Sequence, residues 1–454
     1  MLFILVVGRT LGPSEFGIVT LALIPFQIAT TLGTRTFSQA LIQNKEWMEK
    51  LGQDIWRASV ISGVAVFLII ALCGAAFGYS TGSLNHFIII ALMGLSAPIS
   101  SLAVIPQAIL SREMNFSAIS LIETFSSALA VIAGLCHLYL VGDIYAIVVY
   151  ALTQRITETV LISFTTRKLY ATVTQPLLAS GKVNDLAMKP VIRFTTPLFG
   201  MNLLTAFIQS IDQIFVGLVI GAEALGLYGM ARRITEQPAR LIVQALERAI
   251  FPAAVHALND QDNQTLIYEK AIVIICLVSG ACFFILAATA PLIVPLLLGE
   301  HWRPAILFVQ IFAIQSAVLP VGAVFLSFIT AAGATGKQFA FTITRFTTLL
   351  ISTVLCAWLF EWSAVQLAIA TTVANIALVY PNMILAEKTA QVSSRVGARA
   401  MLRGLTPGLA AGLLAYGIGH TNAAPIPKLA LALTASLIAL ALVGILMLKS
   451  IRRR

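Results

Sequence analysis

Apolar runs long enough to cross a lipid bilayer recur from one end of this chain to the other. A helix needs about 20 predominantly apolar residues in succession to span the hydrocarbon core. Of the 454 residues, 59% are hydrophobic and only 11% are charged. A soluble protein typically carries about 25% charged residues. The sequence therefore predicts an all-α, polytopic membrane protein.

The apolar runs fall into groups of six, six and two. The segments expected to form helices are 1–11, 15–42, 55–79, 84–110, 115–139, 143–166, 191–220, 225–257, 268–298, 304–333, 338–361, 363–386, 401–420 and 426–448. Only seven apolar residues, MLFILVV, precede Gly8. We therefore expect the first helix to be incomplete, through a truncation or a start site placed too late.

This grouping predicts two six-helix lobes followed by two extra helices. The expected parts are an N-terminal lobe (1–168), a cytoplasmic linker (169–190), a C-terminal lobe (191–386), a cytoplasmic loop (387–400), and a last helix pair with a basic tail (401–454).

Basic residues concentrate in alternate short loops. By the positive-inside rule, this distribution places both termini in the cytoplasm. The rule also explains the net charge of +10 without a nucleic-acid partner. No GxxxxGK[ST] nucleotide-binding motif occurs, which excludes an ATP-driven pump made from this chain alone. The five cysteines form no CxxC pair, so neither a metal nor another cofactor is expected.

A glycine pattern occurs twice, at junctions between apolar segments. Spacings of four and then five residues are shared by Gly8, Gly12 and Gly17 and by Gly217, Gly221 and Gly226. Such glycines suit tight hairpins with close helix approach. The alternative is coincidence among 30 glycines. Duplicated halves are common in transporters, so the repeat favours a transport function.

The segment 225–257 carries polar side chains at helical spacing. They recur at intervals of four, three, four and four residues: Arg233, Gln237, Arg240, Gln244 and Arg248. This period places them on one helical face, as a stripe about 22 Å long. Guanidinium groups make bidentate contacts with phosphate oxygens, so the stripe is a candidate substrate-binding surface. Alternatively, Arg248 reaches the membrane surface and neighbouring acids neutralise the other arginines.

A weaker stripe occurs in 15–42 and adds Arg35 to the candidate substrate-binding residues. The 209-residue offset of the glycine repeat aligns the two stripes: Gln27 with Glu236, Thr31 with Arg240, Arg35 with Gln244, and Gln39 with Arg248. We therefore expect 15–42 and 225–257 to face each other across a cavity. A further arginine at membrane depth is Arg345, in 338–361.

Four acidic side chains at membrane depth are candidates for ion coupling or for neutralising arginines. They are Glu123, Glu158, Asp212 and Glu236. Glu158 follows Arg155 by three residues and Glu236 follows Arg232 by four, which are spacings at which helical side chains pair. Asp212 and Glu123 are each either a proton or ion site or the partner of an arginine.

The chain resembles the multidrug/oligosaccharidyl-lipid/polysaccharide exporter superfamily, and within it the polysaccharide transporter branch. The resemblance is carried by GRTLGPSEFGIVTLA (8–22), ALIQNKE (40–46), SREMNF (111–116) and SIDQIFVGLVIGAEALGLY (210–228). It implies a V-shaped, two-lobed fold around a central cavity. It also implies flipping of undecaprenyl-diphosphate-linked oligosaccharides, and Asp212 is the position that matches the family's motif.

We therefore expect a flippase of the bacterial inner membrane that works by alternating access and is not an enzyme. Its expected partners are the lipid-linked glycan, membrane lipids and other polysaccharide assembly proteins. The first alternative is a drug or small-molecule cation antiporter, although cavity arginines disfavour a cationic substrate. A membrane-embedded glycan polymerase and a non-transporting assembly scaffold are further alternatives.

Overall fold

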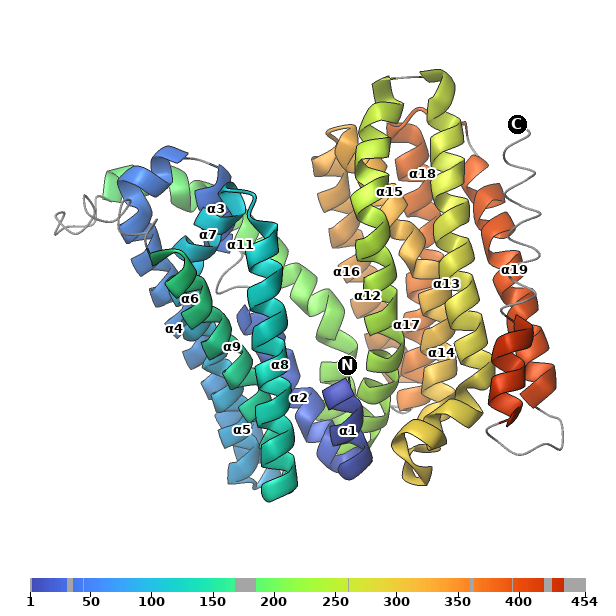
Figure 1. The fold of residues 1–454 in the computed structure, drawn as a ribbon, viewed down its shortest axis with the longest axis horizontal. Coiled ribbons are helices and arrows are strands. Elements are labelled where there is room, and N and C mark those ends of the chain that lie inside the picture. The colour runs from blue at the N-terminus through green and yellow to red at the C-terminus, as the bar shows by residue number, and fades with distance from the viewer. Residues whose placement is uncertain are drawn as a thin grey trace. The chain divides into compact units, whose positions relative to one another are not determined.

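The computed structural model describes residues 2–30, 36–43, 45–167, 185–259, 261–359, 363–393, 395–419 and 427–436. Within these ranges all regular structure is helical (Figure 1). Ten of the described segments are long and apolar enough to cross a membrane. The expected all-α, multi-pass membrane fold is therefore confirmed.

The chain divides into two compact units. The N-terminal unit comprises residues 15–211, and the C-terminal unit comprises residues 1–14 and 212–454. The helices of the N-terminal unit are α2 (Pro13–Thr30), α3 (Thr36–Gln43), α4 (Lys45–Thr81), α5 (Leu84–Gly94), α6 (Ser96–Leu102), α7 (Val104–Arg112), α8 (Phe116–Leu140), α9 (Ala146–Thr165) and most of α11 (Asp185–Phe215).

The C-terminal unit contains α1 and the helices that follow α11. They are α1 (Leu2–Thr10), the π-helix η3 (Val216–Ile220), α12 (Ala222–Asn259), α13 (Gln261–Leu298), the 3-10 helix η4 (Glu300–Trp302), α14 (Ala305–Val318), the 3-10 helix η5 (Leu319–Val321), α15 (Gly322–Ala331), α16 (Thr335–Leu359), α17 (Ala364–Ala377), α18 (Val379–Thr389) and α19 (Val396–Gly419).

The N-terminal helix α1 packs against elements of the C-terminal unit. The indole nitrogen of the buried Trp302 donates to the carbonyl of Gly8 at 2.8 Å. A Cβ on Gly8 would overlap the methyl group of Met230 on α12. In this division α1 belongs to the C-terminal unit and 185–211 to the N-terminal one. The expected lobe boundaries stay a prediction.

Two expected helices, 84–110 and 363–386, are interrupted one turn before a proline. The interruptions and the prolines that follow them are Leu95 with Pro98, Ala103 with Pro106, and Leu378 with Pro381. Proline cannot donate to the carbonyl four residues earlier, and its ring crowds that carbonyl. These interruptions divide 84–112 into α5, α6 and α7, and 364–389 into α17 and α18.

Glycines set the contact between α13 and α19. Gly404, Gly408 and Gly412 follow one another every fourth residue of α19, and the space beside them is filled by Cys276, Gly280 and Phe284 of α13. Such spacing lets two helix backbones approach closely. Farther along, the Ser436 hydroxyl donates to the Ala411 carbonyl at 3.0 Å. The helical residues 427–436 therefore pack on α19, and 437–448 lie outside the described residues.

Gly408→Leu is expected to weaken the packing of α19 on α13. A Cβ at position 408 would lie 2.6 Å from the amide nitrogen of Ala281, and the backbone cannot rotate away as a flexible side chain can. Overpacking of this kind costs about 1–3 kcal/mol, so thermal unfolding of the detergent-solubilised protein should begin at a lower temperature. Gly417→Leu on the same helix is the control, because nothing lies within 4 Å of its Cβ. Equal unfolding temperatures for the two variants would contradict the packing argument.

Candidate functional site

The repeated glycines lie at two helix junctions, as the sequence predicted. Gly12 separates α1 from α2, and Gly221 separates η3 from α12. Gly221 adopts φ +121°, a conformation that a residue with a Cβ rarely enters. The chain therefore reverses between α11 and α12. This reversal brings Asp212 against residues of α12 that follow it by 16 and 20 positions.

Asp212 and Arg232 form an ion pair inside the C-terminal unit. Nη1 of Arg232 donates to both carboxylate oxygens of Asp212, at 2.6 and 2.7 Å. The two side chains are 11% and 9% exposed, so solvent screens this pair weakly. The backbone amide of Gln213 donates to the same carboxylate at 2.9 Å. The structure therefore makes Asp212 the partner of an arginine, which is one of its two expected roles.

Tyr228 completes the environment of Asp212. Its hydroxyl donates to Asp212 at 2.6 Å, and the side chain is fully buried. The ring packs edge-on against Phe312, with the ring centroids 4.8 Å apart, and against Phe308. An apolar wall thus fixes the phenol while its hydroxyl satisfies the carboxylate. Sequence reasoning missed Tyr228, because a tyrosine in an apolar segment gives no charge signal.

Glu236 links the buried pair to the stripe on α12. Nε of Arg232 donates to one carboxylate oxygen of Glu236 at 2.5 Å, which confirms the expected pairing. Nη2 of Arg240 lies 3.5 Å from the other oxygen. Side-chain exposure rises along the series, from 11% at Arg232 to 27% at Glu236 and 48% at Arg240. The charged side chains thus lead from the interior of the unit to its surface.

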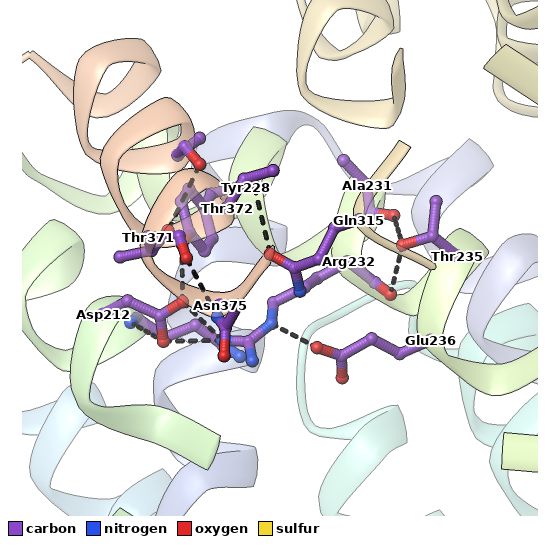
Figure 2. Close-up of polar contacts among 12 residues, drawn as sticks. Asp212, Tyr228, Ala231, Arg232, Thr235, Glu236, Gln315, Thr371, Thr372 and Asn375 are labelled. Carbon is purple, nitrogen blue, oxygen red and sulfur yellow. Dashed lines mark hydrogen bonds and ion pairs between the residues drawn. The ribbon is translucent and has the colours of Figure 1, made fainter. Parts of the chain in front are cut away.

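Polar side chains from α14 and α17 lie beside this network (Figure 2). The Thr372 hydroxyl donates to Gln315 at 3.0 Å. Asn375 accepts from Arg345 at 3.1 Å and donates to the Thr371 carbonyl at 3.0 Å. The structure thereby brings Arg345 of α16 into contact with α17. The sequence identified Arg345 as charged at membrane depth but gave no sign of its amide partner.

The stripe on α12 faces away from the core of the C-terminal unit. Arg240 and Gln244 are exposed, and Arg233 and Gln237 are half-buried. Between these positions, Ile234 and Thr235 are buried. The expected helical face therefore exists as one surface of α12. The side chain of Arg248 and the whole of Arg35 lie outside the described residues.

The other two acidic candidates belong to the N-terminal unit. Arg155 and Glu158 of α9 pair at 2.9 Å, and the Arg155 guanidinium lies 5.5 Å from the ring centroid of Phe26. Glu123 is an exposed residue of α8. Ion coupling by any of the four acids stays a prediction. Within the described ranges, no three His, Cys, Asp or Glu side chains gather in a way that could hold a metal ion.

The helical spans and the buried charges define a multi-pass membrane protein with a charged network inside one of its two units. The family model for the polysaccharide biosynthesis protein family matches residues 6–307, and the chain belongs to this family. This match confirms the resemblance to polysaccharide transporters.

Two curated relatives have names that refer to polysaccharide biosynthesis. The teichuronic acid biosynthesis protein TuaB of Bacillus subtilis (strain 168) is 27% identical over 63% of this chain and 58% of its own length. The lipopolysaccharide biosynthesis protein WzxC of Escherichia coli (strain K12) is 22% identical over 70% of this chain and 63% of its own length. The chain thus spans less than two thirds of either relative.

The fold is similar to that of a solved flippase. The lipid II flippase MurJ in an inward closed conformation aligns with a TM-score of 0.73 at 12% identity. The alignment covers 99% of this chain and 96% of that one. At 12% identity, the similarity establishes the fold alone.

Removing the charge of Asp212 is expected to destabilise the protein, because Arg232 loses one of its two carboxylates inside the membrane. Breaking a buried ion pair costs about 3–5 kcal/mol, and we expect the lower end for Asp212→Asn because Glu236 remains.

Tyr228→Phe removes one hydrogen bond to Asp212 and should lower the free energy of unfolding by about 1 kcal/mol. Thermal unfolding in detergent measures both effects.

A double variant isolates the interaction. Asp212→Asn combined with Arg232→Gln should be less destabilised than the two single variants together, because neither partner is left charged and unpaired. Strict additivity of the single effects would contradict the pairing. Glu300→Gln is the control, because its pair with Arg303 is exposed and its loss should leave the unfolding temperature unchanged.

Proposed function

We propose that this protein flips a lipid-linked oligosaccharide carrying a diphosphate group across the bacterial inner membrane. Support comes from membership of the polysaccharide biosynthesis protein family and from the MurJ-like fold. The observation that carries the proposal is the exposed, arginine-bearing face of α12, where Arg240 and Gln244 point away from the core. A diphosphate at membrane depth needs cationic partners of this kind.

In the proposed mechanism the arginines attract the diphosphate and the protein alternates between inward and outward access. Arg240 is the best placed described residue, because its side chain is 48% exposed and its ion pair with Glu236 is long, at 3.5 Å. Arg35, Arg233 and Arg248 would extend the cationic surface, and Gln237 and Gln244 would donate hydrogen bonds to it. Asp212 and Glu236 would be the charge partners of the arginines. The lipid tail would stay in the bilayer throughout.

We further propose that the chain is a transporter without catalytic activity and that both termini are cytoplasmic. The orientation rests on the concentration of Lys and Arg in alternate loops. Its partners would be the lipid-linked glycan, membrane lipids and other proteins of polysaccharide assembly. No step of the mechanism calls for a cofactor.

Arg240→Gln is expected to reduce translocation of the glycan. The substitution removes the most exposed cation of the described stripe and keeps a polar side chain of similar length. A strain whose own copy is deleted, complemented with Arg240→Gln, should display at least about tenfold less surface polysaccharide. The lipid-linked oligosaccharide should accumulate in its cytoplasmic leaflet.

Arg303→Gln serves as the matched control, because Arg303 is also an exposed arginine paired with a nearby glutamate but lies in the short connection between α13 and α14. Its complementation should equal that of the wild type. Full complementation by Arg240→Gln would contradict the proposed role of the stripe. Efflux of cationic dyes or drugs by the wild type, without any effect on surface glycan, would favour the antiporter alternative.

The proposed orientation is tested with reporter fusions at the C-terminus. A green fluorescent protein fused after Arg454 should fluoresce, because it folds in the cytoplasm, and an alkaline phosphatase fused at the same point should be inactive. The phosphatase fused within the connection between α13 and α14 is the control and should be active. The opposite pattern would reverse the orientation.

A further inference from the structure

Arg345 is an arginine of the C-terminal unit whose hydrogen-bond partner is neutral. It lies half-buried on α16, and its Nη2 donates to the amide oxygen of Asn375 at 3.1 Å. Among the described residues no ion pair joins Arg345 to a carboxylate. Asn375 is in turn held by the Thr371 carbonyl, so the amide is oriented and fixes the guanidinium.

The nearby carboxylates are already engaged by other arginines. Asp212 is bound by Arg232 and Tyr228, and Glu236 is shared between Arg232 and Arg240. Arg345 interacts electrostatically with this network, attractively with Glu236 and repulsively with Arg232. Within the described part of this network, the three arginines Arg232, Arg240 and Arg345 accompany two carboxylates, so positive charge exceeds negative charge.

A surplus cation at membrane depth is costly and needs a counter-anion. Of the two carboxylates, Glu236 has the greater exposure, at 27% against 9%. Its longer contact, 3.5 Å to Arg240, is weaker than a usual charged hydrogen bond. Glu236 also accepts from Arg232 at 2.5 Å, but Asp212 holds the same guanidinium through both of its oxygens. Glu236 is thus the carboxylate that an incoming anion could replace while Arg232 keeps a charged partner.

We propose that Arg345 binds a phosphate of the diphosphate group and that Glu236 is the internal counter-anion with which this phosphate competes. This inference rests on the proposed function and adds a binding residue from α16 to the stripe on α12. Asn375 is the positioning residue, because it holds the guanidinium without neutralising it. Binding of the phosphate would displace Glu236 from Arg240 and leave Asp212 to hold Arg232.

The test measures binding of farnesyl diphosphate to the purified full chain in detergent. Arg345→Gln should weaken binding by at least about tenfold, because a charge-assisted contact is lost. Glu236→Gln should tighten binding by about three- to tenfold, because the competing carboxylate is gone while Asp212 still holds Arg232. A variant that merely misfolds cannot bind more tightly, so the two opposite shifts distinguish competition from structural damage.

Inorganic pyrophosphate and farnesol identify which part of the probe is bound. Pyrophosphate should show the same order of affinities among the variants as farnesyl diphosphate. Tighter binding of farnesyl diphosphate than of pyrophosphate would identify the lipid-linked form as the preferred source of the diphosphate. The affinity for farnesol should be unchanged by Arg345→Gln. An equal loss for farnesol would assign Arg345 a structural role and overturn the proposal.

The remaining outcomes separate this inference from the proposed function. If the wild type binds farnesyl diphosphate and Arg345→Gln binds it equally well, the role of Arg345 is wrong and the flippase proposal stands. If Glu236→Gln weakens binding of farnesyl diphosphate, Glu236 is not a competitor. This inference then fails, and the flippase proposal stands. If the wild type binds neither diphosphate, both proposals fail.

Discussion

An unpaired guanidinium group at membrane depth is costly, and Arg232 is neutralised by carboxylates on either side of it. Asp212 reaches it from α11 and Glu236 from the next turn of α12. The first contact fastens α11 to α12 across the reversal at Gly221, and the second positions Glu236 against Arg240. The polar face of α12 thus depends on one buried arginine.

The glycine repeat explains how this arrangement forms locally. Both copies lie where one helix ends and the next begins. Only the second copy is followed by the acid–arginine network, since Gln27 in the first half stands in register with Glu236 in the second. Two similar hairpins therefore carry different charges, and the C-terminal unit alone combines Arg232, Glu236 and Arg240 on one helix. This asymmetry is the basis for proposing that α12 binds the anionic group of the substrate.

The arginines of the charged network have the chemistry that the proposed diphosphate substrate requires. Arginine binds phosphate in a fork geometry and keeps its charge in any surroundings. Side-chain exposure rises from Arg232 to Arg240. Arg232 is therefore a fixed cation in the interior of the C-terminal unit, and Arg240 is a more accessible cation at its surface. A substrate that carries both a diphosphate and a lipid tail suits such a surface, because the charged group needs arginines while the tail stays in the bilayer.

The sequence by itself determined the membrane class, the apolar segments that form the helices, the polar face of α12 and the pairing of Arg232 with Glu236. These features are local, because hydrophobic length and helical period act over about 20 residues or fewer. Only the tertiary structure decided that Asp212 pairs with Arg232, that Asn375 holds Arg345, and that Trp302 binds Gly8. Those partners lie 20, 30 and 294 positions apart. Helical periodicity relates residues of one helix, whereas contacts between helices depend on how their faces pack.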